Sequence, residues 1–448
     1  MTGALPPGPG VRGSLAFVRA ASRGDVLGYF SALTRRYGPV SSLPLGPGRV
    51  VLVDEPRLIE EVLVTRQHEF VRDTGAAILR ELVGDGLLTS EDPAHLRRRR
   101  IVQPAFHRAR VAAYATTIAC EVERVVAGWD ATRPLDLGRE MARLALAAVG
   151  ASLFGADLRE RATEVAAVLA GVTRRGGSLA LVLTVAGPLL GPLRRAFPKR
   201  ASLLFPRERA RLEAIVAPLV AGERERSGGD DLLSLLLAAR DDGGSGLDDA
   251  AIRNEVCMLI LAGHETTANA LTWTWSLLGD HPDAEARLFD EIDTVLGGRT
   301  PTLEDVARLP YVGDVFNEAL RLYPPASAFG RRPLAATELG GFAIPKGASI
   351  FLSPFVTGRN GRFFDDPLAF KPERWRGAPP PPKFAFFPFG GGSKMCIGEP
   401  FARLEAVLAI ATIAARYRFD RIDRSPMGLA AGALLRPARP LLVRALAR

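Results

Sequence analysis

A lone cysteine stands among glycines in the segment 389–398, which reads FGGGSKMCIG. The three glycines at 390–392 predict a tight turn, because glycine accepts a positive φ without steric cost. The helical pattern that follows would direct its N-terminal N–H groups and positive dipole end at Cys396, which favours the thiolate. Gly398 would let a flat ligand approach that helix start. A thiolate held in this way can ligate a haem iron and supply it with electron density.

The other cysteines predict no chemistry. Cys120 and Cys257 lie in apolar helical stretches and are expected to be buried structural residues. Three widely spaced cysteines, with none of the five histidines beyond residue 281, fit neither a disulfide framework nor a zinc cluster. The simplest expectation is a reducing compartment, the cytoplasm.

A second unusual group is AGHETT at 262–267, inside a long helical pattern over Asp249–Asp280. A glycine inside a helix is destabilising, and a threonine there can bond back to a carbonyl one turn earlier. Because the rest of the helix is apolar, these destabilising residues indicate a functional role. Ala262 and Gly263 would let a flat ligand and a small gas approach the backbone.

Two further pairs have helical spacing. Glu318 and Arg321 share one face of a predicted helix over 312–322. This i,i+3 spacing usually indicates an ordinary surface ion pair. His95 and Arg99 also share a face and could both reach one carboxylate. They stand in PAHLRRRR, where Arg98 is interpreted as part of a solvated basic face.

The elements that must position these residues form one large, mostly α domain with a minor β portion. Residues 1–90 mix helices with strands such as 49–54, and residues 91–323 are helical. Residues 324–448 carry short strands, a meander, the Cys396 loop and a last helix over 401–416. The whole chain, 1–448, is expected to be a single domain.

These motifs, in this order, resemble the cytochrome P-450 family, in particular its bacterial, soluble haem-thiolate monooxygenases. The resemblance runs from PPGP at 6–9 to the last helix. It implies a haem b (iron protoporphyrin IX) buried between the long central helix and the helix after the Cys loop. Cys396 would be the axial iron ligand and Phe389 would shield its sulfur. Glu265 and Thr266 would deliver protons beside a bound O2.

The resemblance also assigns residues to the haem propionates: His95, Arg99, Arg331 and Lys394. Arg331 is preferred to Arg332 from the register of the turn at Gly341. Lys394 replaces the usual arginine or histidine and lacks the planar fork of a guanidinium.

A structural network behind the Cys loop would join Glu318 and Arg321 to Arg374 of the PERW segment. Trp375 of that segment replaces the commoner phenylalanine, a change that is not expected to disturb the network.

Substrate contacts are expected from a loop at 73–88, the segments 178–193 and 428–434, and the residues Ala262, Ala326, Ser327, Ala328 and Phe329. All but the first of these segments are poor in charge. The expected substrate is therefore a hydrophobic small molecule: a terpenoid, a fatty acid or a polyketide-like compound.

Electrons are expected from a separate ferredoxin or flavodoxin with its reductase, because 448 residues leave no room for a reductase domain. An acidic carrier would dock on the Cys396 side against Arg97, Arg98, Arg100 and Lys383. The rival is a peroxide-driven or rearranging haem-thiolate enzyme, which is disfavoured because such relatives commonly lose the acid–alcohol pair that is intact here.

The net charge of +9 first suggests nucleic acid. Only five of the 58 basic residues are lysines, so an arginine-rich coding bias explains the charge better. No helix-turn-helix, finger or basic-aromatic stripe supports nucleic-acid binding or a sensor role. The apolar stretch 178–193 is interrupted by glycine and proline and is shorter than the ~20 residues of a bilayer span, so no transmembrane anchor is expected.

Overall fold

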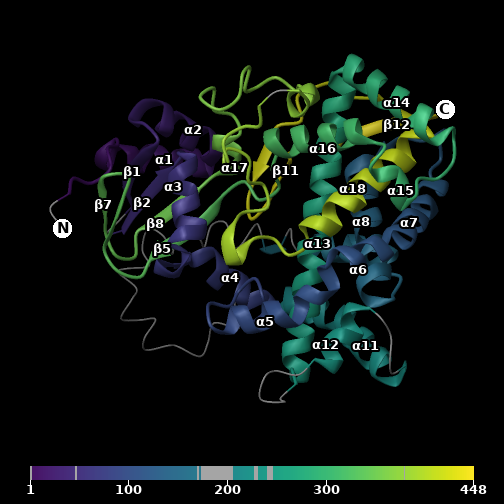
Figure 1. Cartoon of the computed structure of the whole chain (residues 1–448), viewed down its shortest axis with the longest axis horizontal. Helices are drawn as coiled ribbons and strands as arrows, with labels where there is room; N and C mark the ends of the chain where they lie inside the picture. Colours follow the sequence, from purple (N-terminus) through teal and green to yellow (C-terminus); the bar gives the residue numbers. More distant parts are fainter. Residues whose placement is uncertain are drawn as a thin grey trace.

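The structure is a computed structural model, described for residues 3–45, 48–168, 171–172, 205–226, 231–239, 246–377 and 379–448. Helices dominate it and strands are minor, as predicted (Figure 1). The helices are α1 Gly10–Ser22, α2 Val26–Tyr37, α3 Pro56–Glu60, α4 Thr74–Val83, α5 Ala94–Val102, α6 Arg108–Ala113, α7 Ala115–Ala127, α8 Leu137–Phe154, α11 Pro206–Arg226, α12 Leu232–Ala238, α13 Asp249–Asp280, α14 Pro282–Leu296, α15 Leu303–Val306, α16 Pro310–Leu322, α17 Pro354–Thr357 and α18 Glu399–Ala414.

The long central helix α13 spans the predicted residues, Asp249–Asp280. Asp248 caps its N-terminus by accepting a hydrogen bond from the backbone N–H of Ala251 at 2.7 Å. The helix is buried on most sides because α8, α16 and α18 pack around it (Figure 1). It is therefore the rigid element against which the candidate site is built.

The strands form one larger sheet and several small ones. The larger sheet has the order β1-β2-β8-β5-β3, in which β2 and β8 run parallel and the other pairs antiparallel. The strands are β1 Val40–Leu45, β2 Gly48–Val53, β3 Phe70–Arg72, β4 Leu135–Asp136, β5 Phe329–Pro333, β6 Thr337–Leu339, β7 Phe342–Ile344, β8 Ser349–Leu352, β9 Tyr417–Arg421, β10 Leu429–Ala431, β11 Leu435–Pro437 and β12 Leu442–Ala447.

The sheet lies at the opposite end of the molecule from α14 and α15 (Figure 1). One hydrophobic cluster fills the helical part, and smaller clusters pack on the two sides of the larger sheet. Among the helices described, none is both long enough and apolar enough to cross a bilayer.

Candidate active site

The Cys396 loop makes the tight turn that its glycines predict. Gly390 and Gly392 have φ of +76° and +70°. A Cβ on Gly392 would lie 1.8 Å from the carbonyl oxygen of Leu63, so no other residue fits there. The backbone N–H of Cys396 donates to the carbonyl of Phe389 at 2.9 Å, which closes the loop. Helix α18 begins three residues after the cysteine, at Glu399.

Opposing effects act on the Cys396 thiol. Burial raises its pKa, while the backbone N–H groups of Gly398 and Glu399 and the charge of Arg99 act to lower it. The amides at the helix start are thus the donors expected for a thiolate, although burial has the larger effect on the free thiol. A bound metal ion deprotonates a coordinating thiol outright.

The other cysteines differ from one another. Cys257 is buried, as predicted, and burial raises the pKa of its thiol to about 12. Cys120 is exposed on α7, so the prediction of a buried residue was wrong there. The reason is that its position on α7 turns it away from the core formed by Ile118, Ala119 and Val122.

The AGHETT segment lies in the middle of α13. The hydroxyl of Thr266 donates to the carbonyl of Ala262 at 2.5 Å, the backward bond that the sequence suggests. Glu265 is half-buried, and burial raises the pKa of its carboxyl group. Gly263 also has a packing role that the sequence did not indicate, because a Cβ there would lie 2.9 Å from Cγ2 of Val149. The glycine therefore permits close packing against α8.

Exposure inside the molecule marks an open space. Ala262 is exposed although α13 is a core helix, and Cys396 is exposed although burial dominates its electrostatics. An exposed side chain that is surrounded by protein must border an internal space. Because Cys396 directly precedes α18, and α18 packs against α13, we expect both residues to border the same space.

Basic side chains gather at one side of the Cys loop. A guanidinium nitrogen of Arg99 donates to the carbonyl of Met395 at 2.8 Å, and Nδ1 of the buried His95 lies 3.1 Å from Asp92. Arg331 is buried, and within the described residues its guanidinium donates a hydrogen bond to the carbonyl of Gly330 at 2.9 Å. Among the described carboxylates, none forms an ion pair with Arg99 or Arg331. Burial lowers the pKa of both guanidiniums.

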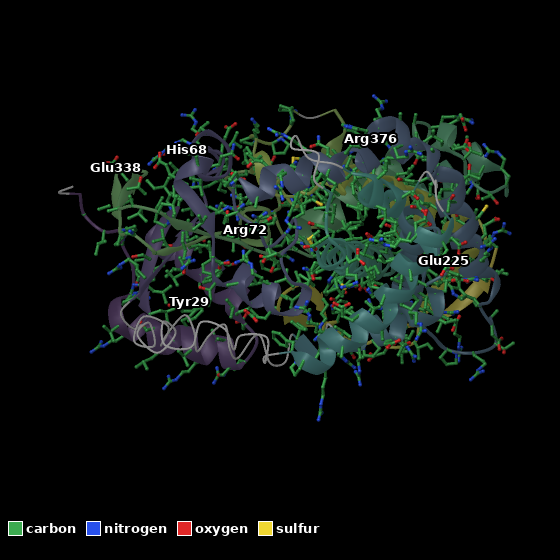
Figure 2. The ribbon with its side chains drawn as sticks, turned by 90° about the horizontal axis from the view of Figure 1, so that it is seen from below. Tyr29, His68, Arg72, Glu225, Glu338 and Arg376 are labelled. Atoms are coloured by element: carbon green, nitrogen blue, oxygen red, sulfur yellow. The ribbon has the colours of Figure 1, made fainter. Side chains whose placement is uncertain are left out.

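Residue pairing in the sheet distinguishes Arg331 from Arg332. It also identifies Arg72, which the sequence did not indicate, as a candidate site residue. Arg331 on β5 lies directly opposite Arg72 on β3, whereas Arg332 pairs with Val71 and points to the other face. Like charges directly opposite are destabilising. A buried and a half-buried arginine on one face therefore require anions beside them. In the view of Figure 2, Arg72 lies near the middle and Arg376 nearer the upper edge.

Carboxylates of the chain meet part of that requirement. The guanidinium of Arg72 lies 3.9 Å from the carboxylate of Glu91, which also accepts the backbone N–H of Arg72 at 2.7 Å. Nζ of Lys394 lies 2.8 Å from the same carboxylate and 3.9 Å from Asp92. Lys394 is thus paired within the chain. Arg331 forms no ion pair with a carboxylate in the described part of the chain, although the charges of Glu91 and Asp73 act on its guanidinium.

Arg98 does not form a solvated face, so that interpretation was wrong. Its guanidinium lies 2.8 Å from the fully buried carboxylate of Glu255 on α13. The same carboxylate accepts the backbone N–H of Leu87 at 3.1 Å, and the Met258 sulfur accepts that of Leu88 at 3.0 Å. Glu255 therefore joins α5 and the segment before it to the central helix.

The predicted network behind the Cys loop is present as contacts. Glu318 and Arg321 on α16 are fully buried and form two hydrogen bonds of 2.9 and 2.7 Å. Arg374 reaches the same carboxylate at 2.8 Å. The indole N–H of Trp375 also donates to Glu318 at 3.1 Å, so this residue adds a donor to the network.

The expected substrate segments have different structures. Residues 73–88 are mostly helix and not a loop, because Asp73 caps α4 and Ile78 and Leu82 bury one face. Leu435, at the end of the turn 428–434, donates its N–H to the carbonyl of Pro325 at 2.8 Å. This contact sets β11 beside the start of 326–329 and beside α13. The segment 178–193 lies outside the described residues.

Within 326–329 the environments also differ. Ala326 and Ala328 are half-buried, whereas Ser327 is buried and its carbonyl accepts the hydroxyl of Ser353 at 2.7 Å. The ring of Phe329 lies 6.1 Å from that of Phe387, toward the Cys loop.

Comparison with known proteins decides the family. The profile described as Cytochrome P450 matches residues 6–444 of the chain. The chain belongs to the cytochrome P450 family. It is 40% identical over 420 residues to cyclooctatin synthase of Streptomyces melanosporofaciens, which covers 90% of this chain and 89% of that protein.

Two further relatives are similar over most of their lengths. Cyclooctat-9-en-7-ol 5-monooxygenase of the same organism is 36% identical, covering 88% of this chain and 87% of that protein. Pentalenene oxygenase of Streptomyces avermitilis is 33% identical, covering 87% and 86%. This cytochrome P450 is accordingly a monooxygenase with a haem-thiolate cofactor, and it uses O2 and a redox partner.

The residues of this P450 fit that cofactor. Haem is flat and carries two carboxylates, and the exposed Ala262 on α13 and Cys396 in its loop are the residues expected to border the space for it. The buried guanidinium of Arg331 has no carboxylate partner among the described residues, although a buried charge needs one. Arg99 lies near enough to Cys396 for each to affect the pKa of the other. A sulfur ligand, which a bound metal ion would deprotonate, and an anion-binding side are therefore both available.

We expect His264 to make the stability of this P450 depend on pH. The side chain is buried on α13, and burial lowers its pKa to about 4, which a contact with the backbone of Ala142 offsets only in part. The unfolded chain binds this proton near pH 6.5. Stability should therefore be complete above pH 6.5 and fall as the pH decreases to about 4, by ~3 kcal/mol from this residue.

The measurement is the free energy of unfolding by urea at several pH values between 4 and 7. The variant His264→Gln should reduce the loss of unfolding free energy below pH 6.5. His107→Gln, at an exposed position, should leave that loss unchanged. Equal acid limbs in wild type and His264→Gln would show that this histidine does not cause the loss.

Proposed function

We propose that this cytochrome P450 oxidises an unsaturated, mainly hydrocarbon terpenoid. The observation that carries the proposal is the 33–40% identity, over most of the chain, to enzymes named for cyclooctatin, cyclooctat-9-en-7-ol and pentalenene. By their names the last two compounds are an unsaturated alcohol and an unsaturated hydrocarbon. The half-buried Ala326, Ala328 and Phe329 supply a matching apolar surface without charge.

The experiment is a titration of the oxidised enzyme with polycyclic terpenes and fatty acids of equal carbon number, followed by the Soret spectrum. A terpene that binds in the site and excludes water from it should shift the band toward shorter wavelength. Turnover under labelled O2 should then place one labelled oxygen in the product. A shift with fatty acids and with none of the terpenes would contradict the substrate class.

We assign the cofactor contacts as follows. Cys396 would ligate the iron, and Phe389 would pack beside the sulfur, since its carbonyl already holds the cysteine N–H. Arg331 and Arg99 would bind the propionates, because both are basic groups without a carboxylate partner in the described structure. His95 lies beside them, and Arg72 would share the charge of a propionate with Arg331. Lys394 would contribute its positive charge to the propionate side while it remains paired with Glu91.

When bound, the haem activates O2, which is chemistry that no side chain supplies. The chain contributes proton delivery on the α13 side. Burial raises the pKa of Glu265, so its carboxyl group can carry a proton closer to neutral pH than an exposed glutamate. The hydroxyl of Thr266 is held by the carbonyl of Ala262 and can pass a proton at its Oγ1. Ala262 itself leaves room for the gas.

Thr266→Ala should uncouple electron consumption from product. Without the hydroxyl, protons reach the oxygen site less selectively. The rate of product formation should fall by roughly 10²-fold while oxidation of the electron donor continues. The matched control is Thr274→Ala, which removes the same type of bond, from Thr274 to the carbonyl of Ala270, further along α13. Product formed per electron pair is the measurement. Equal coupling in the two variants would count against the role of Thr266.

The electron donor would be an acidic ferredoxin or flavodoxin that approaches the Cys396 side. Arg97 and Arg100 are exposed on α5, beside the Arg99 contact with Met395. Arg98 is removed from this surface by Glu255, and Lys383 is exposed but paired with Glu60.

Reduction by an acidic ferredoxin should slow by about tenfold or more between about 50 and about 500 mM salt, because screening removes the electrostatic attraction. Arg100→Gln should weaken this dependence, whereas Arg133→Gln, which is exposed near the C-terminal end of α7, should not. Stopped-flow reduction under carbon monoxide provides the rate. A rate independent of salt would exclude an electrostatic docking face.

A further inference from the structure

The outer face of α1 carries a stripe of exposed apolar side chains. Val11, Leu15 and Val18 are 75%, 65% and 38% exposed, and their spacing of four and three residues places them on one side of the helix. Isolated exposed apolar residues are ordinary on protein surfaces. Three in register on one helix form a continuous face, which is less common and marks an interaction surface.

The inner face of the same helix explains why the stripe is outside. Phe17 is buried, with its ring 5.7 Å from that of Tyr29 and 6.0 Å from that of Phe30. The hydroxyl of Tyr29 donates to the carbonyl of Gly13 at 3.0 Å. Helix α1 is therefore held to α2 and β1 by the face opposite the stripe (Figure 1).

Arginines border the stripe along one side. Arg12 and Arg19 each follow a stripe residue by one position, which places them about 100° around the helix, and Arg23 continues the row. All three are exposed, and none forms an ion pair with any carboxylate in the described part of the chain. The sequence contains no acidic residue before Asp25. The surface is thus both apolar and positively charged.

We propose that α1 docks this cytochrome P450 on the surface of an anionic lipid membrane. The apolar stripe would enter the headgroup region, and Arg12, Arg19 and Arg23 would lie at the lipid phosphates. A helix of 13 residues is about 20 Å long, too short to span the ~30 Å hydrocarbon core, so it would lie in the plane of the interface. The inference does not depend on the terpenoid substrate.

The charge and size of the surface favour lipid over the other possible occupants. In a contact between two copies of α1, six arginines would meet with no acidic residue in that segment to balance them. A stable protein partner needs a buried area of about 1,200 Å² or more. Three side chains on a short helix offer far less, whereas a membrane needs no matching pocket.

The test is co-sedimentation of the haem-loaded enzyme with vesicles of phosphatidylcholine alone or mixed with phosphatidylglycerol, at physiological salt. Because the chain carries a net charge of +9, binding by the wild type alone does not decide the question. The decisive comparison is between Leu15→Ser combined with Val11→Ser and a control, Leu368→Ser. Leu368 is 72% exposed and lies outside the stripe.

The stripe variant should lose vesicle affinity about tenfold or more, and the control should not. Each of Arg12→Gln and Arg19→Gln should reduce affinity for anionic vesicles about fivefold, with no such effect on neutral ones. Unchanged reduced-CO spectra and thermal midpoints will show that the variants are folded. Equal binding by the stripe variant and the control would overturn the proposal. So would a concentration-dependent dimer of the wild type that the stripe variant does not form.

Discussion

The Cys396→Ala variant is expected to lose the strongly red-shifted Soret band of the reduced, CO-bound enzyme. That shift requires thiolate ligation of the haem, which Cys396 would supply as the only cysteine in the glycine turn before α18. The Gly398 and Glu399 amides and Arg99 are arranged around this sulfur. The measurement is the difference spectrum of the dithionite-reduced protein with and without carbon monoxide.

The controls are the other two cysteines of the chain. Cys257→Ala changes a buried thiol on α13, and Cys120→Ala changes an exposed one on α7. Both should keep the red-shifted band at full intensity per haem. The assignment of Cys396 as iron ligand fails if its alanine variant keeps that band, or if either control loses it.

Local patterns were predictable because their physical causes are local. The long apolar run between Asp248 and His281 defined the bounds of α13, and the glycines at 390–392 predicted a turn that needs positive φ. The contact between Glu318 and Arg321 follows from their i,i+3 spacing on one helix. In each case the residues that determine the structure are neighbours in the sequence.

Contacts between distant segments could not be predicted in this way. Arg98 and Glu255 are 157 residues apart, and the pattern around Arg98 resembles an exposed basic run until α5 is placed against α13. Arg72 was missed because its importance arises only when β3 and β5 pair and set it opposite Arg331. Gly263 has a packing role for the same reason, since Val149 belongs to another helix.

The direction in which a side chain points was also difficult to predict from the sequence. Helical spacing alone did not tell which face of α7 would be buried, so Cys120 was placed in the core. Spacing also did not show that Trp375 would turn its indole N–H toward Glu318. A single signal was available for that residue: a buried indole usually finds a hydrogen-bond acceptor.

Glu318→Gln is expected to destabilise the protein by about 3–5 kcal/mol, enough to prevent accumulation of haem-loaded enzyme. The carboxylate is fully buried and faces two guanidiniums, Arg321 and Arg374. Glutamine keeps the shape but leaves both positive charges without an anion in a buried site. The matched control is Glu373→Gln in the same segment, where an exposed pair with Arg287 contributes little. Urea unfolding followed by circular dichroism gives both values.

A double variant tests whether the charge or the geometry of this network matters more. Glu318→Leu with Arg321→Met, made in an Arg374→Met background, removes all three charges of the network, which in many proteins is neutral or stabilising. Here we expect no rescue, because Arg321 also donates to the carbonyls of Gly358, Pro367 and Ala369. Those buried acceptors would lose their donor, at about 1–3 kcal/mol each. If the double variant is as stable as the wild type, the network acts only through charge balance, and its role in holding the chain between 358 and 369 is wrong.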